Sequence, residues 1–125
     1  MIREILIPIY NATVKFVMSD DIDKEMAKHC DSIGDDEEAM TIWFEDSHYY
    51  VMGIRKDMFK QETLTHECSH LAHRIMNSVG IGASLLDDEA EAYLIGYLAG
   101  EIVNMAYEEL DADWLAHTYM KNFPL

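Results

Sequence analysis

The chain has little cysteine and no long apolar run. It carries two cysteines in 125 residues and no C-x-x-C pair, which excludes a structural zinc finger. No apolar segment reaches the roughly 18 residues that a membrane-spanning helix needs, so we expect no membrane partner. The N-terminus shows no small-residue cleavage site of the kind that follows a secretory signal. We therefore expect a cytoplasmic protein in which Cys68 is a buried free thiol.

Positive charge is also scarce. Nine Lys and Arg stand against 24 Asp and Glu, giving a formal net charge of −15. Such acidity repels nucleic acid and anionic membranes, so we expect neither as a partner. It would suit a basic peptide or protein substrate, although solubility alone explains the charge of most acidic proteins. Gly-rich phosphate loops, a Ser-His-Asp order and basic-aromatic patches are all missing from the sequence.

What the chain does contain is an H-E-x-x-H motif, formed by His66, Glu67 and His70. Residues four apart lie on one face of an α-helix, so both imidazoles could reach one metal ion. Bond lengths of about 2.0–2.1 Å suit Zn²⁺ as that ion. Glu67 could then act as the general base toward a metal-activated water.

The residues around the motif favour a helix that is long enough to carry it. Lys60 to Val79 contains no Gly or Pro, and Gly80 and Gly82 follow as a helix end and loop. The apolar residues recur at helical spacing and predict a buried face: Leu64, Cys68, Leu71, Ala72, Ile75, Met76 and Val79. Two unrelated histidines on an ordinary helix are the alternative interpretation.

A catalytic zinc site usually has three protein ligands and one open position. The acidic segment 87–93 opens a second predicted helix, and Glu89 lies 19 residues beyond His70. Glu89 shares a face with Tyr93, Gly96 and Gly100, and small residues allow two helices to approach closely. We therefore predict Glu89 as the third ligand. Glu91, Asp87, Asp88 or a remote His are the alternatives.

Other polar residues are weaker candidates for chemistry. Tyr93, one turn past Glu89, is our candidate for stabilising an oxyanion, although an aromatic residue packed between helices is the simpler interpretation. His73 could be a spare ligand, a partner of the ligands or a surface residue, and His117 lies on the last predicted helix. His29 and His48 have the pattern of surface residues.

These motifs resemble the gluzincin branch of zinc metallopeptidases. The shared features are the H-E-x-x-H helix and a helical glutamate about twenty residues later, and the run 88–97 also resembles small zinc-peptidase-like bacteriophage proteins. The resemblance spans residues 65 to about 100. It implies His66, His70 and Glu89 as zinc ligands and Glu67 as the base. The chain departs from metzincins, because His73 stands where they need Gly, and it lacks the Asn-Glu start of the third-ligand helix in thermolysin.

The chain is short enough for one domain, covering residues 1–125, and apolar enough to fold around a core. We expect strands at 5–10 and 13–18, a helix at 20–30, strands at 39–44 and 48–55, and helices at 60–79, 87–109 and from 111 onward. Ser19 and Asp57 are the expected helix caps. The order β-β-α-β-β-α-α-α predicts an α+β, zincin-like fold, with the helices on one face of a small mixed sheet.

The second pair of strands suggests how a substrate could bind. An extended peptide can pair with an exposed strand edge through main-chain hydrogen bonds. Met52 and Gly53 are candidates for that edge, with the identity of the outermost strand left open.

Two functions follow from these patterns. The first is a zinc-dependent peptide-bond hydrolase that uses Zn²⁺, with a peptide or protein as substrate. The alternative is an acidic, zinc-stabilised binding or inhibitor protein on the same scaffold without turnover. The sequence does not indicate the oligomeric state.

Overall fold

The computed structural model of the protein describes residues 1–29, 39–44, 47–80, 89–110, 113–115 and 119. Within them a four-stranded sheet is formed by β1 (Ile2–Ile7), β2 (Ala12–Ser19), β3 (Ala39–Trp43) and β4 (Tyr49–Arg55). The strand order is β1-β2-β4-β3. The pairs β1–β2 and β3–β4 are antiparallel, whereas β2 and β4 run parallel. The predicted α+β class with a mixed sheet is therefore confirmed.

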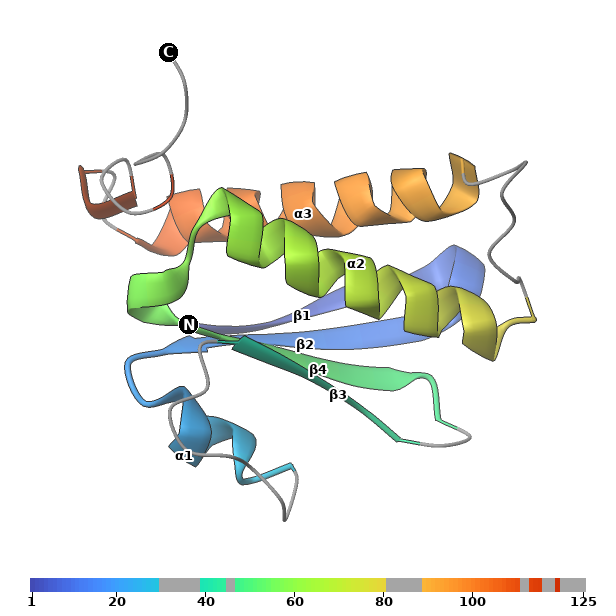
Figure 1. Ribbon diagram of the computed structural model, residues 1–125, viewed down its shortest axis with the longest axis horizontal. Coiled ribbons are helices and arrows are strands. Elements are labelled where there is room, and N and C mark those ends of the chain that lie inside the picture. The colour runs from blue at the N-terminus through green and yellow to red at the C-terminus, as the bar shows by residue number, and fades with distance from the viewer. Residues whose placement is uncertain (30–38, 45–46, 81–88, 111–112, 116–118, 120–125) are drawn as a thin grey trace.

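Two long helices cover one face of the sheet. α2 (Gln61–Ser78) and α3 (Glu89–Glu109) run antiparallel above the strands in Figure 1. Alternate residues of the central strands point toward them, among them Phe16 on β2 and Met52 on β4, both fully buried. The predicted apolar stripe of α2 is buried from Leu64 to Met76, and only its last member, Val79, is exposed.

A short helix covers the opposite face, so the expectation that all helices share one face is wrong. α1 (Ile22–Met26) lies below the sheet in Figure 1 and packs Ile22 and Met26 against Val17 and Val51. The central strands are apolar on both faces, and the second face needs its own cover. A Cβ at Gly53 would lie 2.6 Å from Met26 Sδ, which shows how closely α1 approaches β4.

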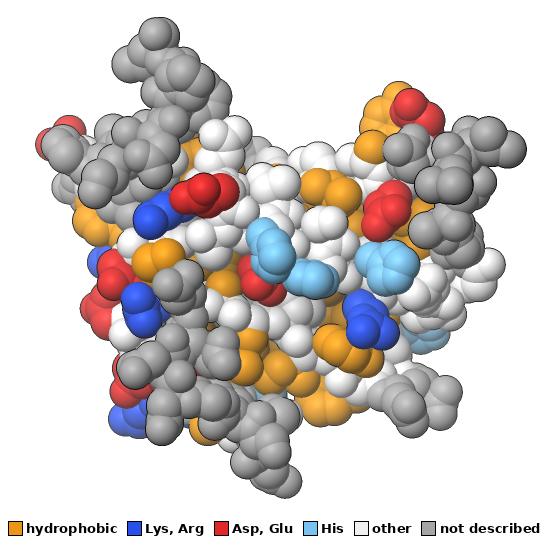
Figure 2. All heavy atoms as spheres, viewed as in Figure 1, with side chains coloured by type: hydrophobic (Ala, Val, Ile, Leu, Met, Phe, Trp, Pro, Cys, Tyr) orange, Lys and Arg blue, Asp and Glu red, His pale blue; other side chains and the backbone are white. Residues whose placement is uncertain are grey.

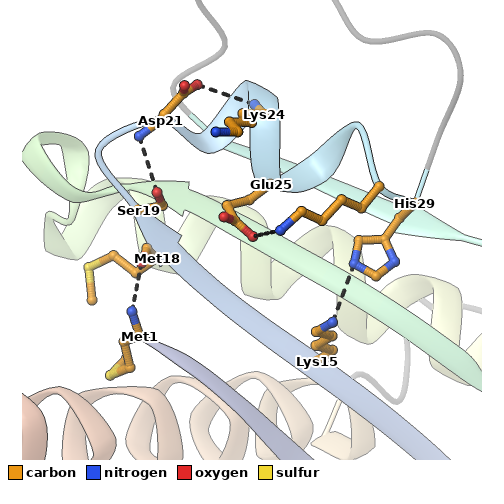
Figure 3. A network of polar contacts seen from close by, with 9 residues as sticks. Met1, Lys15, Met18, Ser19, Asp21, Lys24, Glu25 and His29 are labelled. Atoms are coloured by element: carbon orange, nitrogen blue, oxygen red, sulfur yellow. Dashed lines mark hydrogen bonds and ion pairs between the residues drawn. The ribbon is translucent and has the colours of Figure 1, made fainter.

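Polar contacts flank both ends of α1 (Figure 3). Asp21, rather than the expected Ser19, caps the helix by accepting a hydrogen bond from the Lys24 backbone N–H. Ser19 instead accepts from the Asp21 backbone N–H. Beyond the helix, His29 Nε2 lies 3.4 Å from Lys15 Nζ on β2. Burial, followed by the charge of Lys15, lowers the pKa of His29.

Several predicted boundaries shift by a few residues. Pro8 ends β1 and begins a 3-10 turn, η1 (Pro8–Tyr10), which Asn11 closes in the left-handed conformation at φ 51°. A second turn, η2 (Lys56–Met58), precedes α2. Asp57 pairs with Arg55 at 2.6 Å, and Lys60 occupies the cap position of α2 without a side-chain hydrogen bond. Asp57 is therefore not the cap that we expected.

Other expected features lie partly outside the described residues. Asp87, Asp88, Gly82 and the start of the last predicted helix fall in undescribed segments. Residues 113–115 are helical, and Leu115 is buried in the main core. A helix that could cross a membrane does not occur among the residues that the structure describes.

Candidate metal centre and cleft

The motif helix α2 lies over the sheet between β3 and α3. Its apolar stripe packs downward, which leaves His66 and His70 on the outer surface, while Glu67 is buried beneath it. Figure 2 shows histidine side chains grouped at the middle of this face, with an acidic side chain beside them. The helix thus presents both imidazoles to solvent, as metal chemistry on an incoming substrate requires.

His66 and His70 face one another across one helical turn. Their Nε2 atoms are 3.1 Å apart and their rings meet edge to face. A tetrahedral zinc ion with bonds of about 2.0–2.1 Å holds two nitrogens about 3.3 Å apart. The two imidazoles are therefore spaced as two corners of such a site. Both side chains are exposed, so an ion could reach them.

Glu67 is the one buried charged residue among those that the structure describes, with 8% of its surface exposed. Thr41 Oγ1, from β3, donates a hydrogen bond of 2.9 Å to Glu67 Oε2. A carboxylate held in this way is fixed in orientation beside the imidazole pair. Its Oε2 is engaged by the threonine, which leaves Oε1 as the oxygen available to another donor.

A cleft opens between α2 and β3 at this point. One hollow of about 310 Å³ is lined by Met40, Thr41, Trp43, Glu67, His70 and Arg74. A second, of about 610 Å³, shares Trp43 and Arg74 and extends toward Asn77 and Ser78 at the end of α2. β3 is an outer strand, whereas Met52 and Gly53 lie on the internal strand β4. The edge beside the motif is thus β3.

The residues that the structure describes do not bring a third ligand to the imidazole pair. Among the described residues, no three His, Cys, Asp or Glu side chains form a group that could hold a metal ion. Glu89 is exposed at the start of α3. Glu91 Oε1 lies 3.7 Å from His73 Nδ1, so it is Glu91 that contacts α2. The assignment of Glu89 as a ligand stays a prediction.

The face that Glu89 shares with Tyr93 does not pack against α2. Residues two apart on a helix point about 200° apart, so Glu89 and Tyr93 project away from the side of α3 that carries Glu91. A Cβ on Gly96 or Gly100 would meet nothing within 4 Å. α3 instead packs through Leu94, Leu98, Ile102 and Ala106. Our expectation that the small residues form the helix–helix contact is wrong, because large apolar residues gain more from burial than glycines do.

Tyr93 lies at a separate surface. It is 75% exposed and lines an apolar hollow of about 570 Å³ with residues of η1 and α3. It lines neither hollow of the cleft. Its predicted oxyanion role therefore gains no support from its position.

The other sequence candidates occupy varied positions. His73 contacts Glu91 and lies 3.2 Å from the Asn77 amide nitrogen, so it belongs to a polar cluster one turn beyond the motif. His48 is exposed and His29 is partly buried near β2, while His117 lies outside the described residues. Cys68 is the buried free thiol that we expected. Burial, and then the charge of Glu67, raises its pKa to about 12, and the thiol lies in the main core.

The sequence analysis did not single out Thr41, Trp43 or Arg74 as residues of the cleft. A signal existed for Arg74, because it follows His70 by four and Glu67 by seven residues and so shares their helix face. Thr41 and Trp43 carry no such signal. Their proximity to Glu67 and Arg74 depends on the pairing of β3 with β4, which sequence spacing does not reveal.

Comparison with known proteins adds no assignment. Neither protein-family models, nor curated proteins, nor solved structures give a significant match to this chain.

Proposed function

We propose that this protein is a zinc-dependent hydrolase of peptide bonds. The observation that carries the proposal is the pair of Nε2 atoms of His66 and His70, 3.1 Å apart, beside the buried carboxylate of Glu67. His66 and His70 would hold the ion, together with a carboxylate from the first turn of α3. Glu89 is the third ligand that the resemblance implies, although its side chain projects away from α2. Glu91, which contacts His73 on α2, is the alternative. Zinc bound there would acidify a water molecule and polarise the substrate carbonyl.

The residues of the chain supply the proton transfers. Glu67 Oε1 accepts a proton from the attacking water, while Thr41 keeps Oε2 engaged and the carboxylate in place. The same carboxyl group then gives that proton to the leaving amine. The cleft between α2 and β3 holds the substrate beside Glu67, and the outer strand β3 offers main-chain groups to an extended peptide.

Metal content tests the ion site. Protein purified without an affinity tag should contain about one zinc per chain. His66→Ala should remove it, whereas the matched variant His73→Ala, two turns along the same helix, should retain it. Stoichiometric zinc in His66→Ala would show that the ligand assignment is wrong.

Activity tests the reaction. A diverse peptide library should be cleaved by the zinc-loaded protein, and a chelator should abolish the cleavage. Glu67→Gln should retain zinc and lose at least about 100-fold in rate, the usual contribution of a general base. Glu62→Gln makes the same chemical change at an exposed position on the first turn of α2 and should leave the rate unchanged.

The alternative function gives a different result in the same assays. A zinc-stabilised binding protein would hold the metal but cleave no peptide, and its net charge of −15 would make capture of a basic partner fall steeply with salt. Zinc without turnover, together with such a partner, would replace the hydrolase proposal.

A further inference from the structure

Arg74 differs from the other described arginines of this chain in its position and its contacts. It is the one Lys or Arg within α2, and α3 contains none. Its guanidinium lies over the ring of Trp43, 4.0 Å from the centroid. Stacking of this kind fixes the plane of a guanidinium and leaves its in-plane N–H groups free to donate.

The guanidinium of Arg74 has no carboxylate partner among the described residues. Two other arginines do: Arg3 pairs with Glu108 and Glu109, and Arg55 pairs with Asp57. An arginine that has no carboxylate partner among the described residues can donate to an anion from outside. The planar fork of a guanidinium matches the two oxygens of a carboxylate.

Arg74 also lies at the boundary between the two hollows of the cleft. It lines both the hollow that contains Glu67 and His70 and the larger one that extends to Ser78. Trp43 lines both as well, so the stacked pair forms the wall that the two hollows share. A group bound to Arg74 therefore lies next to the candidate catalytic residues.

We propose that Arg74, held in place by Trp43, binds a carboxylate of the substrate. The substrate class is then a peptide that bears a carboxylate close to the scissile bond, either its C-terminal carboxylate or an Asp or Glu side chain. The link of this inference to hydrolysis rests on the proposed function. The binding of a carboxylate at Arg74 is independent of that function. The overall negative charge opposes such a ligand only weakly, because salt screens charges beyond about 8 Å at physiological ionic strength.

Nuclear magnetic resonance can test this directly. The chain has two tryptophans, so its spectrum holds two indole N–H signals, which Trp43→Phe assigns. The ligands are three N-acetyl tetrapeptides. The first has a free C-terminal acid, the second is its C-terminal amide, and the third is the same amide with one internal residue replaced by Glu. They are titrated to about 10 mM into Glu67→Gln protein, with and without zinc, so that no turnover interferes.

We expect the Trp43 signal to shift with an acid form at an affinity about tenfold or more above that of the plain amide, the usual gain from a hydrogen-bonded charge pair. The acid peptide and the internal-Glu peptide represent the two possible sources of the carboxylate. The peptide that binds more tightly identifies the source. Arg74→Met should abolish the preference, and Arg74→Lys should restore only part of it. Lys24→Met removes the same charge from α1, on the opposite face of the sheet, and should leave the preference intact.

Three results would overturn the inference. They are an equal response to acid and amide, a preference that survives in Arg74→Met, and no shift of Trp43 with any peptide. If Arg74 instead stabilised an oxyanion, its loss would slow cleavage of acid and amide peptides alike, without a binding preference. A clear acid preference in a protein that cleaves nothing would refute the hydrolase and leave the Arg74 assignment standing.

Discussion

Thr41 Oγ1 donates a hydrogen bond of 2.9 Å to Glu67 Oε2 and thereby joins the outer strand β3 to the motif helix. The bond fixes one oxygen of a carboxylate that is almost fully buried. Thr41 is thus a positioning residue for the proposed base, since it reaches the chemistry through Glu67.

Removing that hydrogen bond should affect turnover more than binding. We expect Thr41→Val to lower kcat about 10- to 100-fold with little change in KM, because a hydrogen bond to a charged group is lost while the side-chain shape is kept. Thr41→Ser retains the hydroxyl and should recover most of kcat. A rise in KM at constant kcat, or no rescue by Ser, would contradict the positioning role.

The third zinc ligand can be identified from α3. By our proposal Glu89→Gln weakens zinc binding at least about tenfold, as loss of a carboxylate from the site should. Glu91→Gln is the matched variant, since Glu91 contacts His73 and lies on the other side of the helix. Zinc affinity is measured by competition with a chromogenic chelator. Weaker zinc binding in Glu91→Gln alone would make Glu91 the third ligand. Unchanged zinc binding in both variants would show that neither residue is a ligand.

Cys68 should be chemically silent in the folded protein. In a Cys30→Ser background it should not react with a thiol reagent at pH 8, because it is fully buried and its pKa is raised to about 12. A thiol with that pKa is ionised at pH 8 in only about one molecule in ten thousand. The colour change of a disulfide reagent, read before and after unfolding in guanidinium, provides the measurement. Rapid reaction in the native state would disprove the burial.

Gly53 and Gly100 should respond oppositely to alanine. A Cβ at Gly53 would lie 2.6 Å from Met26 Sδ and 2.8 Å from Ile22 Cδ1, so we expect Gly53→Ala to cost about 1–3 kcal/mol. At Gly100, inside α3, a Cβ meets open space, and Gly100→Ala should stabilise by about 0.5–1 kcal/mol. Urea midpoints of the two variants give both values. A change in the free energy of unfolding with the same sign in both variants would contradict the close packing of α1.

The sequence predicts the features that arise from local spacing. The buried stripe of α2, the helical setting of His66 and His70, and the strand end at Pro8 follow from periodicity and from the chemistry of proline. The adjacency of the two imidazoles is such a feature as well, because four residues make about one helical turn.

The features that sequence reasoning missed depend on contacts between distant segments. The bond between Thr41 and Glu67 requires β3 to be the outer strand beside α2, which only the order of the sheet decides. The orientation of α3 was misjudged because Gly96 and Gly100 were expected at a close helix contact. Leu94 and Leu98 are buried in the main core instead, and their apolar area outweighs the closer approach that glycines permit.

The parallel pairing of β2 with β4 has a consequence for how this molecule folds. Each outer strand pairs with a sequence neighbour, so β1–β2 and β3–β4 can each form as a local hairpin. Joining the hairpins closes a longer loop, and contacts distant in sequence slow folding. The cleft draws Thr41 from the second hairpin and Glu67 from α2, so it forms only when α2 packs beside the completed β3–β4 hairpin.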